Sequence, residues 1–117
     1  MADMTDAELD AAEQRGRIAA ATEPRAKSAR FDSTRGQIVV DLVNGCTFSF
    51  PARIAQDLEA ATDEQLAQVE VSPAGIGLHW EALDADFTIA GLMAGRFGTA
   101  RYMRERFGPA WDAVAAA

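Results

Sequence analysis

The sequence predicts an α+β protein in which a small antiparallel sheet packs against short helices, with a helical extension at each end. Apolar residues alternate in the segment that starts at residue 37, an Asn-Gly pair follows it, and helix-capping patterns precede the terminal segments. With 117 residues the chain has the length of one domain. We expect an amino-terminal helix in residues 1–22, an α+β core in 24–97 and a helical extension in 98–117.

The first predicted element is a helix that begins after Thr5. Thr5 and Glu8 have the spacing of a capping box, in which each residue bonds the backbone of the other. Leu9 and Ile18 are the large apolar residues of this helix, so it can bury little surface by itself. Pro24 disfavours helix in the residue before it, and the helix should therefore end near residue 21.

The clearest predicted structure is a three-stranded antiparallel meander. Residues 26–32 form its first strand, and the alternation in 37–42 predicts the second. Asn44 and Gly45 favour a type I′ hairpin turn because both tolerate a positive φ. Residues 46–50 alternate again and form the returning strand.

The rest of the chain alternates shorter elements. We expect helices at residues 51–58, 62–68, 88–94 and 99–107, strands at 69–71 and 76–80, and an irregular transition at 82–87. The predicted core comprises Phe31, Ile38, Val40, Leu42, Phe48, Phe50, Ile54, Leu58, Leu66, Val71, Ile76, Leu78, Trp80, Leu83, Ile89 and Leu92.

Charge and cysteine content exclude several classes of protein. The net charge of −7 argues against non-specific binding to nucleic acid or to a membrane surface. Residues 23–35 and 96–117 are each basic, and they either belong to a solvated mixed surface or meet as one basic face. A single Cys46 excludes an internal disulfide and a cysteine-based zinc site, and its predicted strand makes it a buried, unreactive thiol. No apolar run has the roughly 20 residues of a membrane span, so we expect a cytoplasmic protein without a signal peptide.

The chemically interesting residues gather in one strand and the turn after it. His79 is the candidate for proton transfer near neutral pH, and it lies on the opposite strand face from Leu78 and Trp80. Asp84 and Asp86 are two residues apart and could hold a metal or divide acid and base roles. The favoured interpretation is that Asp86 caps the following helix and Asp84 closes the turn. No catalytic, cofactor-binding or metal-ligating residue is assigned.

The last predicted helix carries both basic and apolar residues. Its arginines have the spacing that phosphate contact requires, but they also suit an ordinary solvated helix end. Its apolar residues, together with Val114, offer more surface than a short terminal helix needs, which is typical of an interaction site. The candidate interaction residues are Arg101, Tyr102, Arg104, Phe107 and Trp111.

The stretch from Phe31 to Phe97 resembles a widespread family of small bacterial proteins known as a domain of unknown function. The resemblance rests on Asn44-Gly45, on Phe50-Pro51, on Gly75-x-Gly77-Leu78-His79-Trp80-x-x-Leu83-Asp84-x-Asp86 and on Gly91-Leu92-x-x-Gly95. It implies a small α+β fold in which His79, Trp80, Leu83, Asp84 and Asp86 have structural roles. Some relatives are described as antitoxin-like and encoded beside a small toxin, and others are fused to a helix-turn-helix domain.

Three function hypotheses remain. The first is a non-enzymatic, antitoxin-like interaction module that binds a small basic, toxin-like protein or forms a homodimer, because a charge of −7 suits a cationic partner. The second is a nucleic-acid-binding regulator that uses the arginines of the last helix. The third is a small hydrolase or metal enzyme that uses His79, Asp84 and Asp86. We expect no cofactor and no membrane partner.

Overall fold

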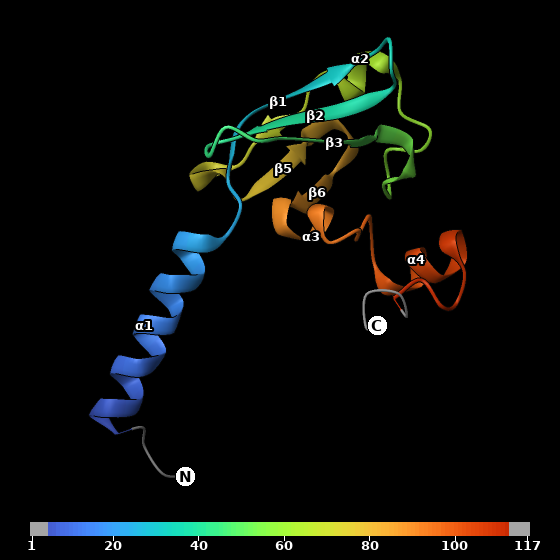
Figure 1. The fold of residues 1–117 in the computed structure, drawn as a ribbon. Coiled ribbons are helices and arrows are strands. Elements are labelled where there is room, and N and C mark those ends of the chain that lie inside the picture. Colours follow the sequence, from blue (N-terminus) through green and yellow to red (C-terminus); the bar gives the residue numbers. More distant parts are fainter. Residues whose placement is uncertain (1–4, 113–117) are drawn as a thin grey trace.

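The computed structural model describes the backbone of residues 5–112 and the side chains of residues 5–14 and 23–112. Within this part, two three-stranded antiparallel sheets form the body of the molecule (Figure 1). The first sheet has the order β1-β2-β3, with β1 (Ala26–Asp32), β2 (Gln37–Leu42) and β3 (Thr47–Pro51). The second has the order β4-β5-β6, with β4 (Glu70–Val71), β5 (Gly77–Trp80) and β6 (Ala85–Thr88). The α+β class is confirmed.

Helices lie at both ends of the described chain and between the strands. The α-helices are α1 (Asp6–Thr22), α2 (Asp63–Leu66), α3 (Ile89–Met93) and α4 (Ala100–Phe107), and the single 3-10 turns are η1 (Ala52–Ile54), η2 (Pro73–Gly75) and η3 (Glu81–Leu83). Helix α1 points away from the body, whereas α4 lies beside it (Figure 1). No helix in the described residues is both long and apolar enough to cross a membrane.

The predicted capping box of Thr5 and Glu8 is present, and a second one begins α2. The backbone N–H of Glu8 donates to the Thr5 hydroxyl at 3.1 Å, and the N–H of Thr5 donates to the Glu8 carboxylate at 3.2 Å. Thr62 and Gln65 make the same reciprocal pair at the start of α2. These bonds satisfy backbone donors that the first turn of a helix leaves without a partner. Ile18, the second apolar residue expected in α1, lies outside the described side chains, and Val114 lies outside the described residues.

The hairpin between β2 and β3 differs from the predicted type I′ turn. Gly45 has φ 91°, but Asn44 does not have a positive φ, and the Gly45 N–H donates to the Leu42 carbonyl at 3.1 Å. The Asn44 side chain instead accepts a bond from the N–H of Cys46 at 2.9 Å, which holds the turn without a left-handed Asn44. Cys46 therefore belongs to the turn and is exposed, so the prediction of a buried thiol was wrong.

Three predictions for the second half of the chain also need correction. The helix expected at residues 51–58 is only the turn η1, because Ala55 has extended backbone angles. Ile76 has helical backbone angles and lies outside β5, so it is 39% exposed and not a core residue. Strand β6 was expected to be irregular, but the left-handed conformation of Asp84 lets the chain reverse and pair with β5.

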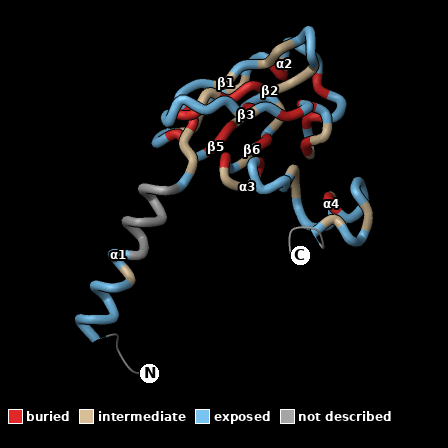
Figure 2. Tube along the Cα trace, in the orientation of Figure 1, coloured by how far each residue is buried: buried red, intermediate tan, exposed pale blue. Residues whose placement is uncertain are grey.

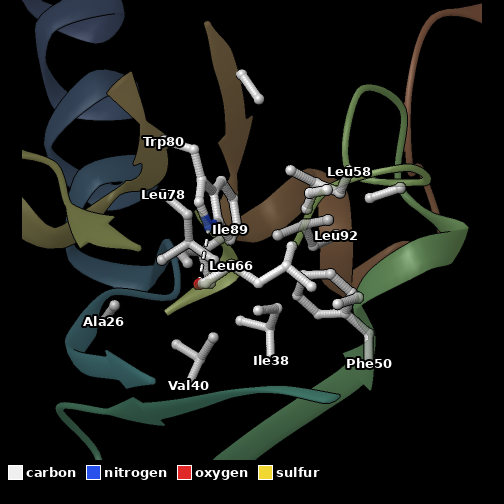
Figure 3. Close-up of a cluster of buried hydrophobic side chains, with 14 of the residues drawn as sticks. Ala26, Ile38, Val40, Phe50, Leu58, Leu66, Leu78, Trp80, Ile89 and Leu92 are labelled. Atoms are coloured by element: carbon white, nitrogen blue, oxygen red, sulfur yellow. Dashed lines mark hydrogen bonds between the residues drawn. The ribbon is translucent and has the colours of Figure 1, made fainter. Parts of the chain in front are cut away.

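The hydrophobic core lies between the two sheets (Figures 2 and 3). Trp80 is 1% exposed, its indole N–H donates to the Leu66 carbonyl at 3.1 Å, and its ring meets Phe87 edge-on. The predicted core residues that are buried are Ile38, Val40, Leu42, Phe50, Leu58, Leu66, Leu78, Trp80, Ile89 and Leu92. Those that are partly buried are Phe31, Phe48, Ile54, Val71 and Leu83. The second sheet, which was not predicted as a layer, thus covers the apolar face of the first.

Candidate functional site

Gly75, the first residue of the signature, lies in η2 against the backbone of β1. Gly75 has φ 75°, and a Cβ at this position would lie 2.5 Å from the carbonyl oxygen of Ala26 in β1. No real Cβ atom approaches a backbone oxygen so closely, so any side chain here would push β1 away from the second sheet. Gly75 therefore serves the junction between the sheets and not a bound phosphate.

His79 is held by carboxylates on the outer face of the second sheet. Its Nδ1 lies 2.7 Å from the Asp86 Oδ1, and its Nε2 lies 2.6 Å from the Glu81 Oε2. Strand register also places Glu70 of β4 opposite His79. Hydrogen bonds to Glu81 and to Asp86 raise the pKa of His79 from 6.5 to about 8. The ring is therefore mostly a cation at neutral pH and is poorly suited to act as a general base.

Asp84 lies in the turn that it was predicted to close, whereas the prediction that Asp86 caps the following helix was wrong. Helix α3 is capped by Thr88, whose hydroxyl accepts the N–H of Gly91 at 3.0 Å, and Asp86 binds His79 instead. Asp84 closes the turn through its left-handed backbone, with φ 48°, and its N–H donates to the Glu81 carbonyl. In the part of the chain that the structure describes, no group of three His, Cys, Asp or Glu residues could hold a metal ion.

A polar cleft of about 560 Å³ lies beside this turn. Asp84 and Asp86 line one side of it, and Asp57, Arg96 and Thr99 are among the residues that complete it. Asp57 has φ 70°, so two of these aspartates adopt the left-handed conformation that L-residues rarely take. The cleft brings together carboxylates and one guanidinium, but it does not include His79.

Helix α4 is attached to the body by its amino-terminal half. The Tyr102 hydroxyl donates to the Ile54 carbonyl at 2.6 Å, and the N–H of Thr99 donates to the Gln56 side chain at 2.9 Å. Met103 is 3% exposed. Burial raises the pKa of the Tyr102 hydroxyl above its ordinary value of 10. Tyr102, which the sequence suggests as an interaction residue, thus has its hydroxyl turned inward and holds α4 in place.

An apolar hollow of about 340 Å³ separates α4 from the segment before it. We call it the C-terminal groove, and it is lined by Gly95, Phe97, Met103, Phe107, Ala110 and Trp111. Phe107 is 44% exposed, and its ring centroid lies 6.4 Å from that of Phe97. Two of the predicted interaction residues, Phe107 and Trp111, therefore share one apolar surface.

The arginines of α4 are not equivalent. Arg101 pairs with Glu105 at 3.1 Å, and Arg106 lies 3.9 Å from Glu59. Arg104 is exposed and makes no ion pair with the described residues; it lies three residues before Phe107, on the same side of the helix. Strand β1, which carries Lys27 and Arg30, lies apart from α4 in Figure 1.

A family model described as "Protein of unknown function (DUF2442)" matches residues 26–98, nearly two thirds of the chain. The chain belongs to this family. Two solved structures are similar to this DUF2442 protein. The first is a protein of unknown function from Rhodospirillum rubrum, which is 56% identical in sequence. The alignment covers 70% of this chain and 99% of the Rhodospirillum chain, with a TM-score of 0.68. The other, an uncharacterised protein from Chromobacterium violaceum, is 34% identical over 90% of this chain and 95% of that chain, with a TM-score of 0.69. No curated protein matches the chain.

The DUF2442 match contains both sheets and all signature residues, but it stops at residue 98. Helix α1 and helix α4 lie outside it, and the C-terminal groove is formed by residues from both sides of its boundary. The family relationship thus covers the body of the molecule, and the surface that carries the predicted interaction residues lies at its edge.

Proposed function

We propose that this protein is a non-enzymatic protein-interaction module and that its C-terminal groove is the contact surface. The observation that carries the proposal is that Phe107 is exposed and Trp111 partly exposed over an apolar floor, with the Arg106 guanidinium over the Phe107 ring. Aromatic residues and arginine dominate the binding energy of protein interfaces, and exposed apolar surface of this kind marks contact sites.

The groove is formed before a partner arrives. Tyr102, Thr99 and the buried Met103 fix α4 to the body, and Phe107 packs against Phe97. A preformed surface loses little conformational freedom on binding, so more of the contact energy contributes to affinity.

The signature region supports a structural role over a catalytic one. His79 is kept protonated between Glu81 and Asp86, and Asp84 serves the backbone of a turn. A general base has to be neutral near the working pH and close to a nucleophile or substrate proton. The bonds of His79 to Asp86 of β6 and to Glu81 of η3 fit a structural role better, and we call this arrangement the His79 clamp.

An antitoxin-like role is a more specific form of a protein-interaction function, and its cationic protein partner would contact the acidic outer face of the second sheet and not the basic surroundings of the C-terminal groove. The outer face of the second sheet supports it, because Glu70, Glu81 and Asp86 surround a single histidine there. The net charge of −7 also favours a basic partner, because long-range attraction steers a basic protein toward this chain.

Photo-crosslinking in the native host tests the proposal. Ala110 lines the groove, so Ala110→benzoylphenylalanine should give adducts that mass spectrometry identifies, whereas the same substitution at the exposed Ala67, just after α2, should not. The adducts should disappear when Phe107→Asp is added. An absence of adducts that depend on Phe107 would contradict the groove as a contact surface.

A further inference from the structure

We infer that the occupant of the C-terminal groove is helix α1 of a second copy of this chain, so that two chains exchange α1 helices reciprocally. The inference rests on the proposed function, because it assigns a partner to the same groove. It concerns a homodimer in which each groove holds a helix that belongs to the other chain.

The described side chains of helix α1, up to Gln14, are almost unpacked. Every described side chain from Thr5 to Gln14 is exposed except Ala12, which is half-buried, and Leu9 is 47% exposed (Figure 2). An isolated helix of 17 residues is marginal in water, and Gly16 weakens this one further. The helix therefore depends on packing that a single chain does not provide.

In the described part of α1, the large apolar residue Leu9 lies on the acidic side of the helix. At 100° per residue, Leu9 and Ala12 lie together, and the acidic residues of this segment fall within about 100° of Leu9. The acidic residues are Asp6, Glu8, Asp10 and Glu13. Ala7, Ala11 and Gln14 form the opposite side and carry no charge.

The C-terminal groove is complementary to that side. Its floor is apolar, its volume of about 340 Å³ is sufficient for a leucine side chain, and the Arg106 guanidinium lies over the Phe107 ring, 5.9 Å from the ring centroid. Residues 96–112 contain four arginines against Glu105 and Asp112, whereas residues 5–14 contain four acids and no base. With Leu9 in the groove and its neighbouring acids near these arginines, both the apolar and the charged parts of the contact would be satisfied.

The geometry favours a second copy over the chain's own helix. Helix α1 leaves the body near the start of β1 and points away from α4 (Figure 1). Stable complexes bury about 1,600 Å² in total, more than one short helix in one groove supplies. A two-fold exchange makes the contact twice, and such isologous dimers are the commonest oligomers.

Sedimentation of the full chain and two matched variants tests the inference. The wild type should sediment as a dimer at micromolar concentration. Leu9→Asp places a charge where α1 enters the groove and should weaken the dimer by about tenfold or more. Ala11→Asp adds the same charge to the opposite side of α1 and should leave the dimer unchanged.

Mixing variants tests the reciprocal exchange. Phe107→Asp removes the groove but keeps α1, and Leu9→Asp removes the α1 contact but keeps the groove. Each should be monomeric alone, and a mixture should contain heterodimers with one intact contact. Circular dichroism checks that both variants fold, and Trp111→Asp replaces Phe107→Asp if α4 is disturbed. A dimer that survives Leu9→Asp, or a mixture that stays monomeric, overturns the exchange.

The outcomes separate this inference from the proposed function. If the wild type is monomeric and Ala110→benzoylphenylalanine still captures an identified host protein in a Phe107-dependent manner, the inference fails and the proposed function stands. A monomer in which Leu9 contacts Phe107 within one chain also overturns the second copy. A monomer without any groove-dependent adduct contradicts both.

Discussion

Trp80 and His79 are neighbours in β5 but face opposite sides of the second sheet. Trp80 points into the core, where its indole N–H reaches the Leu66 carbonyl, and His79 lies on the outer face between two carboxylates. One strand thus supplies the largest buried side chain and the strongest described charge cluster on the opposite face. Their substitution should affect the protein in different ways.

Replacing Trp80 by alanine should lower the free energy of unfolding by roughly 3–5 kcal/mol, because it leaves a large cavity and an unpaired Leu66 carbonyl. Chemical denaturation measures this loss. Trp111→Ala is the control, since Trp111 is only half-buried and its removal should cost much less. Equal losses in the two variants would show that Trp80 is not a central core residue.

The stability of the protein should fall as the pH rises through about 8. The folded-state pKa of His79 is about 8 and exceeds the unfolded value of 6.5, so its contribution is complete below pH 6.5 and is lost above pH 8. His79 is the single histidine of the chain, so NMR can follow its ring protons without ambiguity.

Asp86→Asn should bring the pKa of His79 closer to 6.5, because it removes one of the two carboxylates that stabilise the cation. The melting temperature of a His79→Gln variant should lack the decline between pH 6.5 and 8. A titration midpoint of 6.5 in the unmodified protein would show that the clamp does not form.

At the scale of elements, the junction between the sheets depends on η2. Gly75 ends this turn next to the backbone of Ala26, and β5 begins two residues later. The turn therefore sets both the distance between the sheets and the register of β5.

Gly75→Ala should destabilise the protein by roughly 2–5 kcal/mol, the sum of a left-handed alanine and a clash with the Ala26 carbonyl. Gly36→Ala is a matched control, because Gly36 has φ 68° but no atom within 4 Å of the added methyl group. It should cost only about 1–2 kcal/mol. Thermal unfolding distinguishes the two, and identical costs would mean that the sheets do not approach closely at Gly75.

Elements that are formed by contacts between residues close in sequence could be predicted, and elements that depend on other features could not. The bounds of β1 and β2 are as predicted, because alternation is a local pattern. Strand β6 escapes prediction because the reversal at Asp84 depends on a left-handed aspartate, which local rules do not indicate.

The site was predictable to a similar degree. Phe107 and Trp111 stand out as apolar residues in a terminal segment, and the structure places both in one groove. The inward role of Tyr102 could not be inferred, because its partner is the Ile54 carbonyl, 48 residues away. The clamp on His79 likewise requires the strand register that pairs it with Asp86.

At the scale of the whole molecule, the body is the family-matched region and the terminal helices are attached to it in different ways. Helix α4 is anchored by hydrogen bonds and by a buried methionine, whereas the described side chains of α1 are almost all exposed. The body should therefore fold without either helix, at some cost when α4 is removed.

A chain that lacks residues 99–117 should keep both sheets but lose roughly 2–4 kcal/mol of stability. This loss combines the burial of Met103 with the Tyr102 hydrogen bond. Far-ultraviolet circular dichroism and amide NMR dispersion should show a folded protein with a lower melting temperature. Collapse of the NMR dispersion would mean that α4 is an integral part of the core.

Each sheet is built from three strands that are consecutive in the chain, and this order has a consequence during protein synthesis. The first sheet can pair as soon as Pro51 has emerged from the ribosome, since its hairpins are local. Its apolar face, however, is covered by Leu78 and Trp80, which follow only after roughly one to five seconds at about 5–20 residues per second. During that interval the nascent chain displays Ile38, Val40 and Phe50 to the solvent, and this is the stage at which a chaperone would bind it.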